Sequence, residues 1–351
     1  MTTNALDAIR SSPSPNCAVC GAKGNSLYHG LGDRLFTAPG TWNLSSCPNP
    51  GCGLLWPDPM PLTEDLGKAY QTYYTHASQN QGSGGGWRTN LRHAIERHYW
   101  TNQFSYPPTT LPIWTRICGS IYYCLPLHRL EATAGIRGLT AVSRGRLLDI
   151  GCGSGDWLLT MRELGWDVAG NDFDANAVKV ATDRGLNVAV GSLEDQKLPS
   201  ASFDAVTLSH VIEHLPDPIG TMRECARILK PGGKVVLLTP NCASLSHRFF
   251  KQDWRGLEPP RHLHVFSLKS MDRMLAMTGF EQRSVRPFIV TSVIFESLQL
   301  RWGRTNANDT PRHRWLARLL IPLFKFVESC LIRWQPDVGD CIFASATKPG
   351  K

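Results

Sequence analysis

Three alternate glycines stand where a short apolar run meets a helical pattern, and this arrangement suits a nucleotide-like ligand. The chain reads LLDIGCGSGDWLLTM from Leu147 to Met161. Glycine adopts backbone conformations closed to other residues and lets a ligand lie against the main chain, while the helix start presents unpaired N–H groups. Taken alone, the pattern suits a dinucleotide equally well. The candidate binding residues here are Asp149, Gly151, Cys152, Gly153 and Gly155.

An acidic residue closes the next predicted strand. Residues 166–172 read as a strand, and Asp172 stands 23 positions after Asp149. A carboxylate at the carboxyl end of the second strand of such a fold can accept hydrogen bonds from both hydroxyls of a ribose. We therefore expect Asp172 to bind the sugar of the ligand.

Imidazole and carboxylate groups follow a later strand, where they could do acid–base chemistry. The predicted strand 203–208 runs into Ser209 and His210, and then into Glu213 and His214. Imidazole titrates near neutral pH and can accept a hydroxyl proton without strong retuning. His214 is the predicted general base, and Glu213 need not touch it, because neighbours on a helix point about 100° apart. His262 and His264 are competing candidates, in a Pro-Pro loop expected to overhang the site.

Four cysteines near the start of the chain could hold a zinc ion. Cys17 and Cys20 form one knuckle, Cys47 and Cys52 form another, and 26 residues separate the two. Two such turns supply a tetrahedral set of sulfur ligands. The second knuckle is wider than usual and the linker is longer, but a longer loop costs little closure entropy. Four thiolates leave no open position for substrate, so the predicted zinc is structural.

These groups require a parallel sheet that brings the carboxyl ends of its strands to one edge. The sequence predicts strands over 147–150, 166–172, 188–191, 203–208 and 234–241, a turn at 230–233, and helices over 221–229 and 268–278. Residues 279–288 and 340–347 supply a sixth and a seventh strand. The expected fold class is α/β, a Rossmann-like seven-stranded sheet with helices on both faces.

The ordered set of motifs resembles the class I S-adenosylmethionine-dependent methyltransferases. It comprises LLDIGCGSG, the acid at Asp172, FDAVTLSHVIEHL and ILKPGGKVVLLTPN, and it covers about residues 146–288. The resemblance implies that the backbone at Gly151 and Gly153 holds the methionine part of S-adenosylmethionine and that Asp172 holds its ribose. It further implies that Phe173, Ser192 and Leu193 flank the adenine. Ser209 and His210 would then lie beside the methyl group.

A second role for the histidines stays open. His210, Glu213 and His214, with a histidine from the 262–264 loop, could ligate a divalent ion that orients a diol, as in plant small-RNA 2′-O-methyltransferases, which carry Glu where this chain has His210. Asn241 after Pro240 does not match the signature of amino-group methylation, which favours an oxygen or carbon acceptor. A small zinc-binding module ahead of the cofactor domain also resembles several methyltransferases of sugar-nucleotide and polysaccharide pathways.

The predicted organisation has four parts. They are a disordered leader over 1–16, a zinc-binding module over 17–60, a helical linker or cap over 61–140 and the methyltransferase domain over 141–351, with a helical insertion at about 289–338. Tyr70, Tyr73 and Tyr74 could line a substrate pocket or simply pack at a domain junction. Residues 111–127 are 17 mostly apolar residues, for which we favour a packed cap or a helix lying on a membrane over a span. In the insertion, residues 314–334 read as a lid, an interfacial helix or core packing.

The net charge of +8 is carried by the segments that flank the cofactor domain. Residues 81–146 have 8 basic and 2 acidic side chains, and residues 281–351 have 11 and 6. Basic flanks suggest an anionic partner or merely a soluble cationic surface. Residues 1–15 lack the apolar core of a secretory signal, and the 11 cysteines favour a reducing compartment, so we expect a cytoplasmic protein. The sequence leaves peripheral membrane contact open.

The sequence thus predicts a methyltransferase that acts on a small-molecule acceptor, namely a sugar nucleotide, a glycan or a lipid-linked intermediate. An RNA-modifying enzyme that uses the basic flanks is the first alternative, and we regard nucleic acid as the weaker partner. A non-catalytic scaffold that binds S-adenosylmethionine is the second. The sequence does not indicate an oligomeric state.

Overall fold

A seven-stranded sheet is the framework of the chain. The computed structural model describes residues 8–71, 87–107, 113–123, 126–303, 314–332 and 334–350. The order of the strands is β11-β12-β10-β9-β6-β7-β8. Their bounds are β6 Arg146–Ile150, β7 Asp167–Asp172, β8 Asn187–Val190, β9 Phe203–Ser209, β10 Leu229–Pro240, β11 Glu281–Phe288 and β12 Cys341–Thr347. The expected α/β class and all seven strands are confirmed.

Two compact units share this chain. One comprises Met1–His76, Leu208–Ala226 and Leu237–Lys351, and the other Ala77–Thr207 and Arg227–Val236. We call them the first and the second unit. The boundary falls within β9 and β10, so the acid–base residues after β9 belong to the first unit and the glycine turn belongs to the second.

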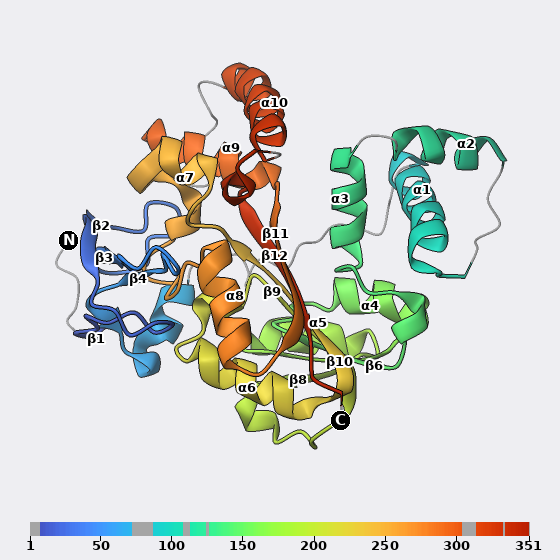
Figure 1. The fold of residues 1–351 in the computed structure, drawn as a ribbon, viewed down its shortest axis with the longest axis horizontal. Helices are drawn as coiled ribbons and strands as arrows, with labels where there is room; N and C mark the ends of the chain where they lie inside the picture. The colour runs from blue at the N-terminus through green and yellow to red at the C-terminus, as the bar shows by residue number, and fades with distance from the viewer. Residues whose placement is uncertain are drawn as a thin grey trace. The chain divides into compact units, whose positions relative to one another are not determined.

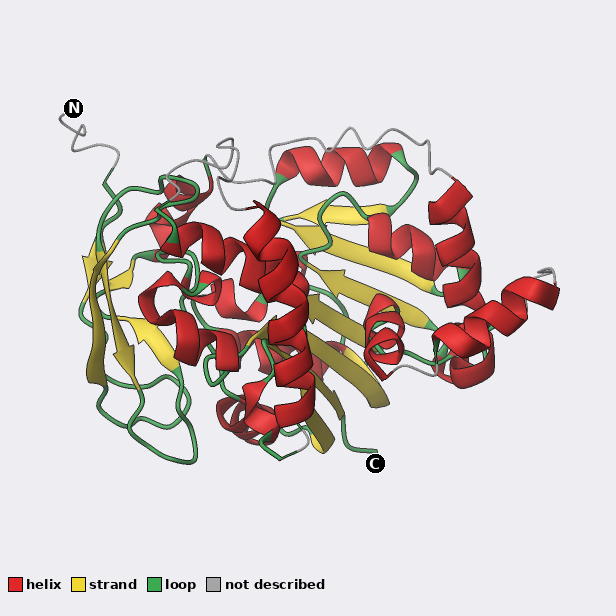
Figure 2. Cartoon of the chain, turned by 90° about the horizontal axis from the view of Figure 1, so that it is seen from above, coloured by secondary structure: helices red, strands yellow, loops and turns green. Residues whose placement is uncertain are grey.

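The second unit carries the parallel strands β6, β7 and β8, which pair side by side. The strands of the sheet are drawn in yellow in Figure 2. Leu147, Leu148 and Ile150 on β6 are buried because helices cover both faces, which makes the strand apolar throughout. Asp174 caps α5 by accepting a hydrogen bond from the amide of Asn176. The helices are α1 Trp87–Phe104, α2 Ile113–Tyr122, α3 Pro126–Gly135, α4 Asp156–Glu163 and α5 Ala175–Asp183, with the short turns η4 Ala141–Ser143 and η5 Glu194–Gln196.

The first unit begins with a small β module, drawn in blue in Figure 1. Strands β2 Asn25–Leu31, β3 Trp42–Ser46 and β4 Leu55–Pro57 form an antiparallel sheet over buried Leu44 and Trp56. The 3-10 helix η2 Thr63–Tyr70 follows. Residues 8–16 differ from the expected disordered leader. Strand β1 Ser11–Ser12 pairs with β5 Met60–Pro61, and Arg10 forms an ion pair with buried Asp65, so this stretch is held by its neighbours.

The rest of the first unit surrounds the antiparallel pair of β11 and β12. Its elements are η6 Ile212–His214, α6 Pro218–Ile228, α7 Leu245–Phe250, η7 Lys251–Asp253, η8 Arg255–Leu257, α8 Leu268–Met277, α9 Thr291–Arg301, α10 Arg314–Leu331 and η9 Pro336–Val338. In Figure 1, α7, α9 and α10 form a group. The expected turn at 230–233 is absent, because β10 runs through these residues with Gly232 at φ 77°. Within the described ranges, no helix has the length and apolarity to cross a membrane.

Candidate functional site

The glycine turn of the second unit has the backbone that its sequence requires. Gly151, Gly153 and Gly155 have φ values of 69°, 54° and 79°, in the left-handed region that favours glycine. A side chain at Gly155 would place its Cβ 2.3 Å from Leu186, so this glycine permits packing. A Cβ at Gly153 would meet nothing within 4 Å. The turn is therefore open to a ligand at Gly153 and closed by the protein at Gly155.

Asp149 lies at the base of this turn and is paired with a residue that the sequence analysis missed. The Asp149 carboxylate is 1% exposed and forms an ion pair with Arg137. It also accepts a hydrogen bond of 2.8 Å from the hydroxyl of Thr207. Burial raises the pKa of Asp149, and the Arg137 charge opposes that rise. A buried carboxylate of this kind needs a cation beside it.

Arg137 is held from a second side by an aromatic ring. Its guanidinium lies 3.6 Å from the centre of the Trp157 ring, a cation–π contact at the start of α4. Arg137 belongs to the stretch predicted as a linker and has a positive φ of 49°. No local sequence pattern pointed to it. Trp157, two residues after Gly155, does not by itself indicate a cation, so the sequence offered no signal for this contact.

Asp172 links the ends of β6 and β7. Its carboxylate accepts hydrogen bonds of 2.8 Å from the amide of Gly153 and 2.9 Å from the amide of Asp174. Burial raises the pKa of Asp172, and these two amides oppose the rise. Next to it, Phe173 is 68% exposed. The acid and the glycine turn are thus brought together as predicted, although their roles toward a donor stay predictions.

The predicted adenine-flanking residues after β8 are also placed. Leu193 is buried, whereas Ser192 hydrogen-bonds Asp195 through its hydroxyl over 2.7 Å. This turn lies next to β7, because Asp172 pairs with Val190 in the parallel register. The order of the strands therefore places Phe173 and residues 192–193 after the ends of two neighbouring strands, and their roles toward adenine stay predictions.

In the first unit, Glu213 is the centre of the polar groups that follow β9. Its side chain is completely buried and accepts a 3.0 Å hydrogen bond from the hydroxyl of Thr239. Nδ1 of His210 lies 3.4 Å from its second oxygen. Burial alone would raise the pKa of Glu213, but the His210 hydrogen bond and the nearby histidines lower it to about 2. Glu213 is thus an anion that holds imidazoles around it.

His214 has a defined tautomer. Its Nδ1 lies 3.0 Å from the carbonyl oxygen of Arg261 and 3.0 Å from the hydroxyl of Tyr70. A carbonyl only accepts, so Nδ1 must carry the proton, and Nε2 of neutral His214 then has the lone pair. This is the form that a general base needs. Ser209, by contrast, is half-buried at the end of β9 and shows no side-chain hydrogen bond in the described structure.

The two competing histidines are fixed as buried neutral groups. Nδ1 of His262 donates to Gly256 O over 2.7 Å, and Nδ1 of His264 donates to Leu215 O over 3.2 Å. Burial lowers the pKa of each to about 4. The ring of His262 lies 4.7 Å from that of His214, and ligand atoms of Glu213, His214 and His262 all lie within 4.8 Å of one another. This set matches the divalent-ion alternative with His262 as the loop histidine, but it does not include His210.

One buried arginine connects this cluster to the β module. Arg261 is 0% exposed and pairs with Asp33 and with Glu258, each over 2.8 Å. It also donates to the carbonyl of Ala69 over 2.8 Å. The Arg261 backbone oxygen is the one that fixes His214. The Pro-Pro loop is therefore a rigid, ion-paired segment that orients the predicted base.

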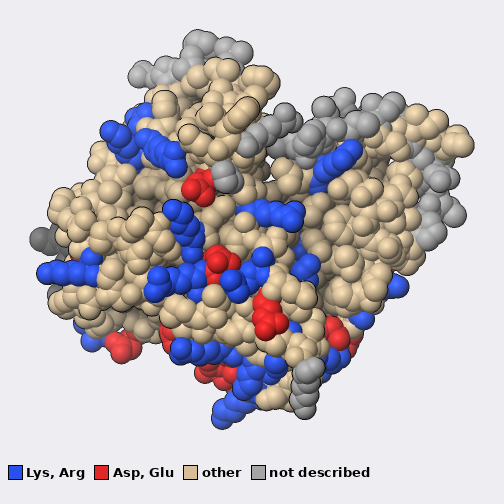
Figure 3. Space-filling view, viewed as in Figure 1, with Lys and Arg blue, Asp and Glu red and all other residues tan. Residues whose placement is uncertain are grey.

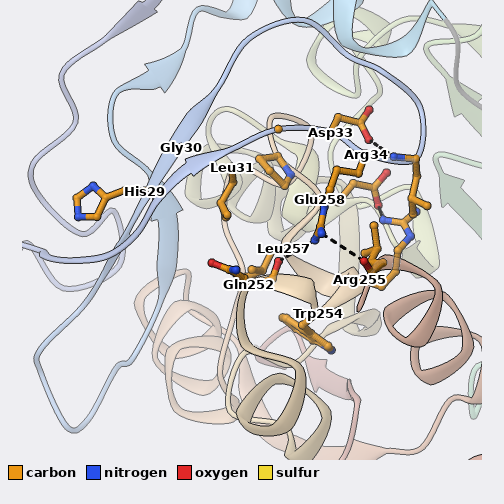
Figure 4. Close-up of a pocket in the computed structure, with 14 residues that line it drawn as sticks. His29, Gly30, Leu31, Asp33, Arg34, Gln252, Trp254, Arg255, Leu257 and Glu258 are labelled. Atoms are coloured by element: carbon orange, nitrogen blue, oxygen red, sulfur yellow. Dashed lines mark hydrogen bonds and ion pairs between the residues drawn. The ribbon is translucent and has the colours of Figure 1, made fainter. Parts of the chain in front are cut away.

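A cavity of about 230 Å³ lies beside this loop (Figure 4). Its walls are residues 29–35 of the β module and residues 252–259 of the loop, with Leu300 from α9. Trp254 lines it, is 1% exposed and has an indole N–H without a hydrogen-bond partner in the described structure. Glu258 lines it as well, and its carboxylate lies 3.4 Å from Nε2 of His262. The cavity is thus connected to the histidine cluster by one carboxylate.

The four predicted zinc ligands come together in the β module. The sulfur atoms of Cys17 and Cys52 are 3.6 Å apart, those of Cys20 and Cys47 are 3.2 Å apart, and all four lie within 4.8 Å of one another. The glycine after each knuckle has a positive φ, 75° at Gly21 and 71° at Gly53. Four converging thiols are the ligand set that Zn²⁺ prefers. All four cysteines are free, since no two of them form a disulfide. The residues therefore fit the predicted ion.

Comparison with known proteins identifies the central part of the chain. Residues 123–285 match the family model for a methyltransferase domain. The ubiquinone biosynthesis O-methyltransferase of Xanthomonas oryzae pv. oryzae strain PXO99A is 40% identical over 125 residues, which cover 33% of this chain and 52% of that protein. Its counterpart in Xanthomonas axonopodis pv. citri strain 306 is 45% identical over 125 residues, with the same coverage. Residues 123–285 are therefore similar to a methyltransferase domain.

The match covers only part of this chain and only part of each curated relative. The chain spans about half the length of the curated relatives it matches. Among solved structures, an S-adenosylmethionine-dependent methyltransferase from Mesorhizobium loti is 20% identical, covers 62% of this chain and 97% of that chain, and has a TM-score of 0.44. One from Archaeoglobus fulgidus is 21% identical, covers 58% and 86%, and has a TM-score of 0.42.

The methyltransferase domain includes Arg137, Asp149, Asp172 and the whole histidine cluster. It begins after the cysteine module and ends before α9 and α10. The resemblance inferred from the motifs is thereby confirmed for the central domain. The zinc ion and the roles of individual site residues stay predictions.

Proposed function

We propose that this chain transfers the methyl group of S-adenosylmethionine to an oxygen of a small-molecule acceptor, with carbon as the less favoured atom. The observation that carries the proposal is the glycine turn with Asp172 bonded across it, inside a region that matches methyltransferase domains. The relatives' name, O-methyltransferase, favours oxygen. In the reaction the acceptor oxygen forms a bond to the methyl carbon, the carbon–sulfur bond breaks, and its electron pair stays on sulfur.

The second unit supplies the residues for the donor. Backbone groups at Gly151 and Gly153 would bind its methionine part, Asp172 would bind the ribose, and Phe173, Ser192 and Leu193 would bound the adenine. To these we add Arg137. The amino-acid end of the donor carries a carboxylate, and Arg137, ion-paired with buried Asp149 at the base of the turn, is the cation that we assign to it.

The first unit supplies the proton acceptor. Nε2 of His214 would take the hydroxyl proton as the oxygen attacks, while the Arg261 carbonyl holds Nδ1–H and keeps the ring in place. Glu213 stabilises the imidazolium that forms, and His210 shares that carboxylate. Positioning supplies the rest of the acceleration, because the sulfonium carbon is already activated.

The acceptor would be a polar molecule that uses the cavity of Figure 4, which is lined by charged residues such as Arg255 and Glu258. A sugar nucleotide, a glycan or a lipid-linked intermediate fits this expectation. The zinc ion, held by Cys17, Cys20, Cys47 and Cys52, would be structural. In a second candidate arrangement, Glu213, His214 and His262 would hold a divalent ion that would orient a diol acceptor, and the convergence of their ligand atoms favours it.

The test is an incubation with methyl-labelled S-adenosylmethionine and a metabolite extract, read by mass spectrometry. Labelled small molecules that disappear on His214→Ala support the proposal. Label in RNA that falls steeply with salt would favour the RNA-modifying alternative instead. Binding of the donor without turnover on any extract would favour the scaffold alternative.

A further inference from the structure

Helix α10 carries an apolar stripe that the protein core leaves exposed. Leu320, Leu323, Phe326 and Val327 are 36%, 59%, 67% and 40% exposed. Their spacing places them along one side of the helix, because residues three, four and seven apart share a face. We call these four residues the α10 stripe. Trp334, 86% exposed, follows the end of the helix.

The other side of α10 already has its packing partners. Ile321 and Phe324 pack against the core cluster that contains Phe250 and Trp254, and Glu328 is completely buried. The α10 stripe is therefore separate from the side of α10 that packs against the core. A continuous row of large apolar side chains on a helix surface is uncommon unless it meets a partner.

The charges of the segment indicate the kind of partner. Residues 314–334 contain four basic residues, Arg314, Arg318, Lys325 and Arg333, and a single acidic one, Glu328, which is buried. Of the described residues beside α10, Arg248 and Lys251 are exposed, and Arg301 stacks on Phe249, whose ring contacts Phe324 of α10. In Figure 3 the surface over α10 is mostly uncharged, and Lys and Arg side chains gather beside it over α7 and α9. An apolar row of side chains bordered by cations suits a lipid bilayer, whose acyl chains lie below a layer of headgroup phosphates.

We propose that α10 docks in the plane of a bilayer that contains anionic phospholipid, with the α10 stripe inserted between the headgroups. Lys325 and Pro322 lie in the middle of the helix, and no described helix has the character of a span, so α10 would lie on the membrane. Trp334 would sit at the headgroup level, where amphipathic rings are favoured. This surface goes beyond the proposed function, because none of its residues takes part in methyl transfer.

The experiment is co-sedimentation of the full chain with sucrose-loaded vesicles, either of phosphatidylcholine alone or with about a third phosphatidylglycerol. The chain should bind the anionic vesicles and lose at least about tenfold in affinity in the double variant Leu323→Glu and Phe326→Glu. The matched control is Val142→Glu with Val180→Glu, exposed apolar residues of the second unit that receive the same charge change, and it should bind like the parent. Thermal unfolding confirms that both variants are folded.

Three results would overturn the proposal. The first is failure of the parent chain to bind anionic vesicles, and the second is equal binding by the α10 variant and the control. The third is a dimer in light scattering that the α10 variant converts to monomer, since the α10 stripe would then be covered by a second copy of the chain. Donor binding by calorimetry is measured in parallel and should be unchanged in every variant.

Discussion

The carbonyl oxygen of Arg261 lies 3.0 Å from Nδ1 of His214, so a residue 47 positions away sets the protonated nitrogen of the predicted base. The same arginine is fully buried between Asp33 and Glu258. The base is therefore oriented by a backbone group that cannot swing away without breaking a buried ion-pair network.

Replacing His214 with Ala should lower kcat by about a hundredfold or more, as expected for loss of a positioned general base. Affinity for S-adenosylmethionine, measured by calorimetry, should stay within about twofold, because the donor residues are on the second unit. The matched control is Tyr70→Phe, which removes the other contact of Nδ1 and leaves the Arg261 carbonyl in place. A His214→Ala enzyme with full kcat would eliminate the role of this ring as base.

Arg137→Met should weaken donor binding and lower stability together. The change leaves the Asp149 carboxylate buried without its cation, which typically costs about 3–5 kcal/mol. The double variant Arg137→Met with Asp149→Asn should recover much of the stability, since the stranded charge is gone, but not the donor affinity. Urea unfolding and calorimetry separate the two effects. Recovery of donor affinity in the double variant would show that Arg137 acts only as a structural partner.

The zinc prediction is tested by metal analysis and unfolding. One zinc ion per chain is expected, and Cys47→Ser should reduce both the metal content and the melting temperature, because a structural site contributes directly to folding. Cys330→Ser is the matched control, since that thiol is free and exposed. Purified chain with no zinc and an unchanged melting temperature in Cys47→Ser would count against the site.

Glu328 and Asp340 predict a distinctive pH dependence of stability. Burial and the charge of Asp340 raise the pKa of Glu328 to about 9, and burial raises that of Asp340 to about 7. The unfolded chain ionises these acids near their ordinary pKa values, so the folded state holds more protons and becomes less stable as the pH rises from about 4.5 to 9. Glu328→Gln should therefore stabilise the chain by about 1–3 kcal/mol at pH 8 and have little effect below pH 4.5.

The measurement is the free energy of unfolding as a function of pH for the parent chain and for Glu328→Gln. Glu296→Gln is the control, because that acid is partly exposed and paired with Arg255. A difference between parent and Glu328→Gln that does not change from pH 5 to pH 9 would contradict the raised pKa.

The sheet and the donor turn were predictable because their signals are local. Apolar runs such as 147–150 end in glycines and acids at the spacing that a parallel sheet uses, and the structure places Asp172 on the Gly153 amide as that spacing implies. Arg137 was not predictable, since its partner is fixed by how the preceding helices fold back onto β6. The same holds for Arg261, whose three partners come from the β module, η2 and its own loop. Long-range ion pairs leave no periodic trace in a sequence.

The predicted disorder of residues 8–16 and the predicted turn at 230–233 were wrong for a related reason. Ser- and Pro-rich residues 8–16 look unstructured by composition, yet Arg10 and Ser11 find partners near residues 60–65 that composition does not reveal. The sequence Lys-Pro-Gly-Gly is typical of a turn, but here these residues lie near the start of strand β10. Tertiary pairing overrode the local preference in both places.

The position of Asp33 connects the β module to the predicted base. Asp33 holds Arg261 from the same small sheet that the four thiols tie together, and Arg261 in turn orients His214. Removing the metal from the thiols, or oxidising them, would leave the His214 ring less firmly oriented. The glycine turn would still bind the donor. Loss of the predicted zinc would then reach His214 through Asp33 and Arg261, so turnover is expected to fall with the zinc content.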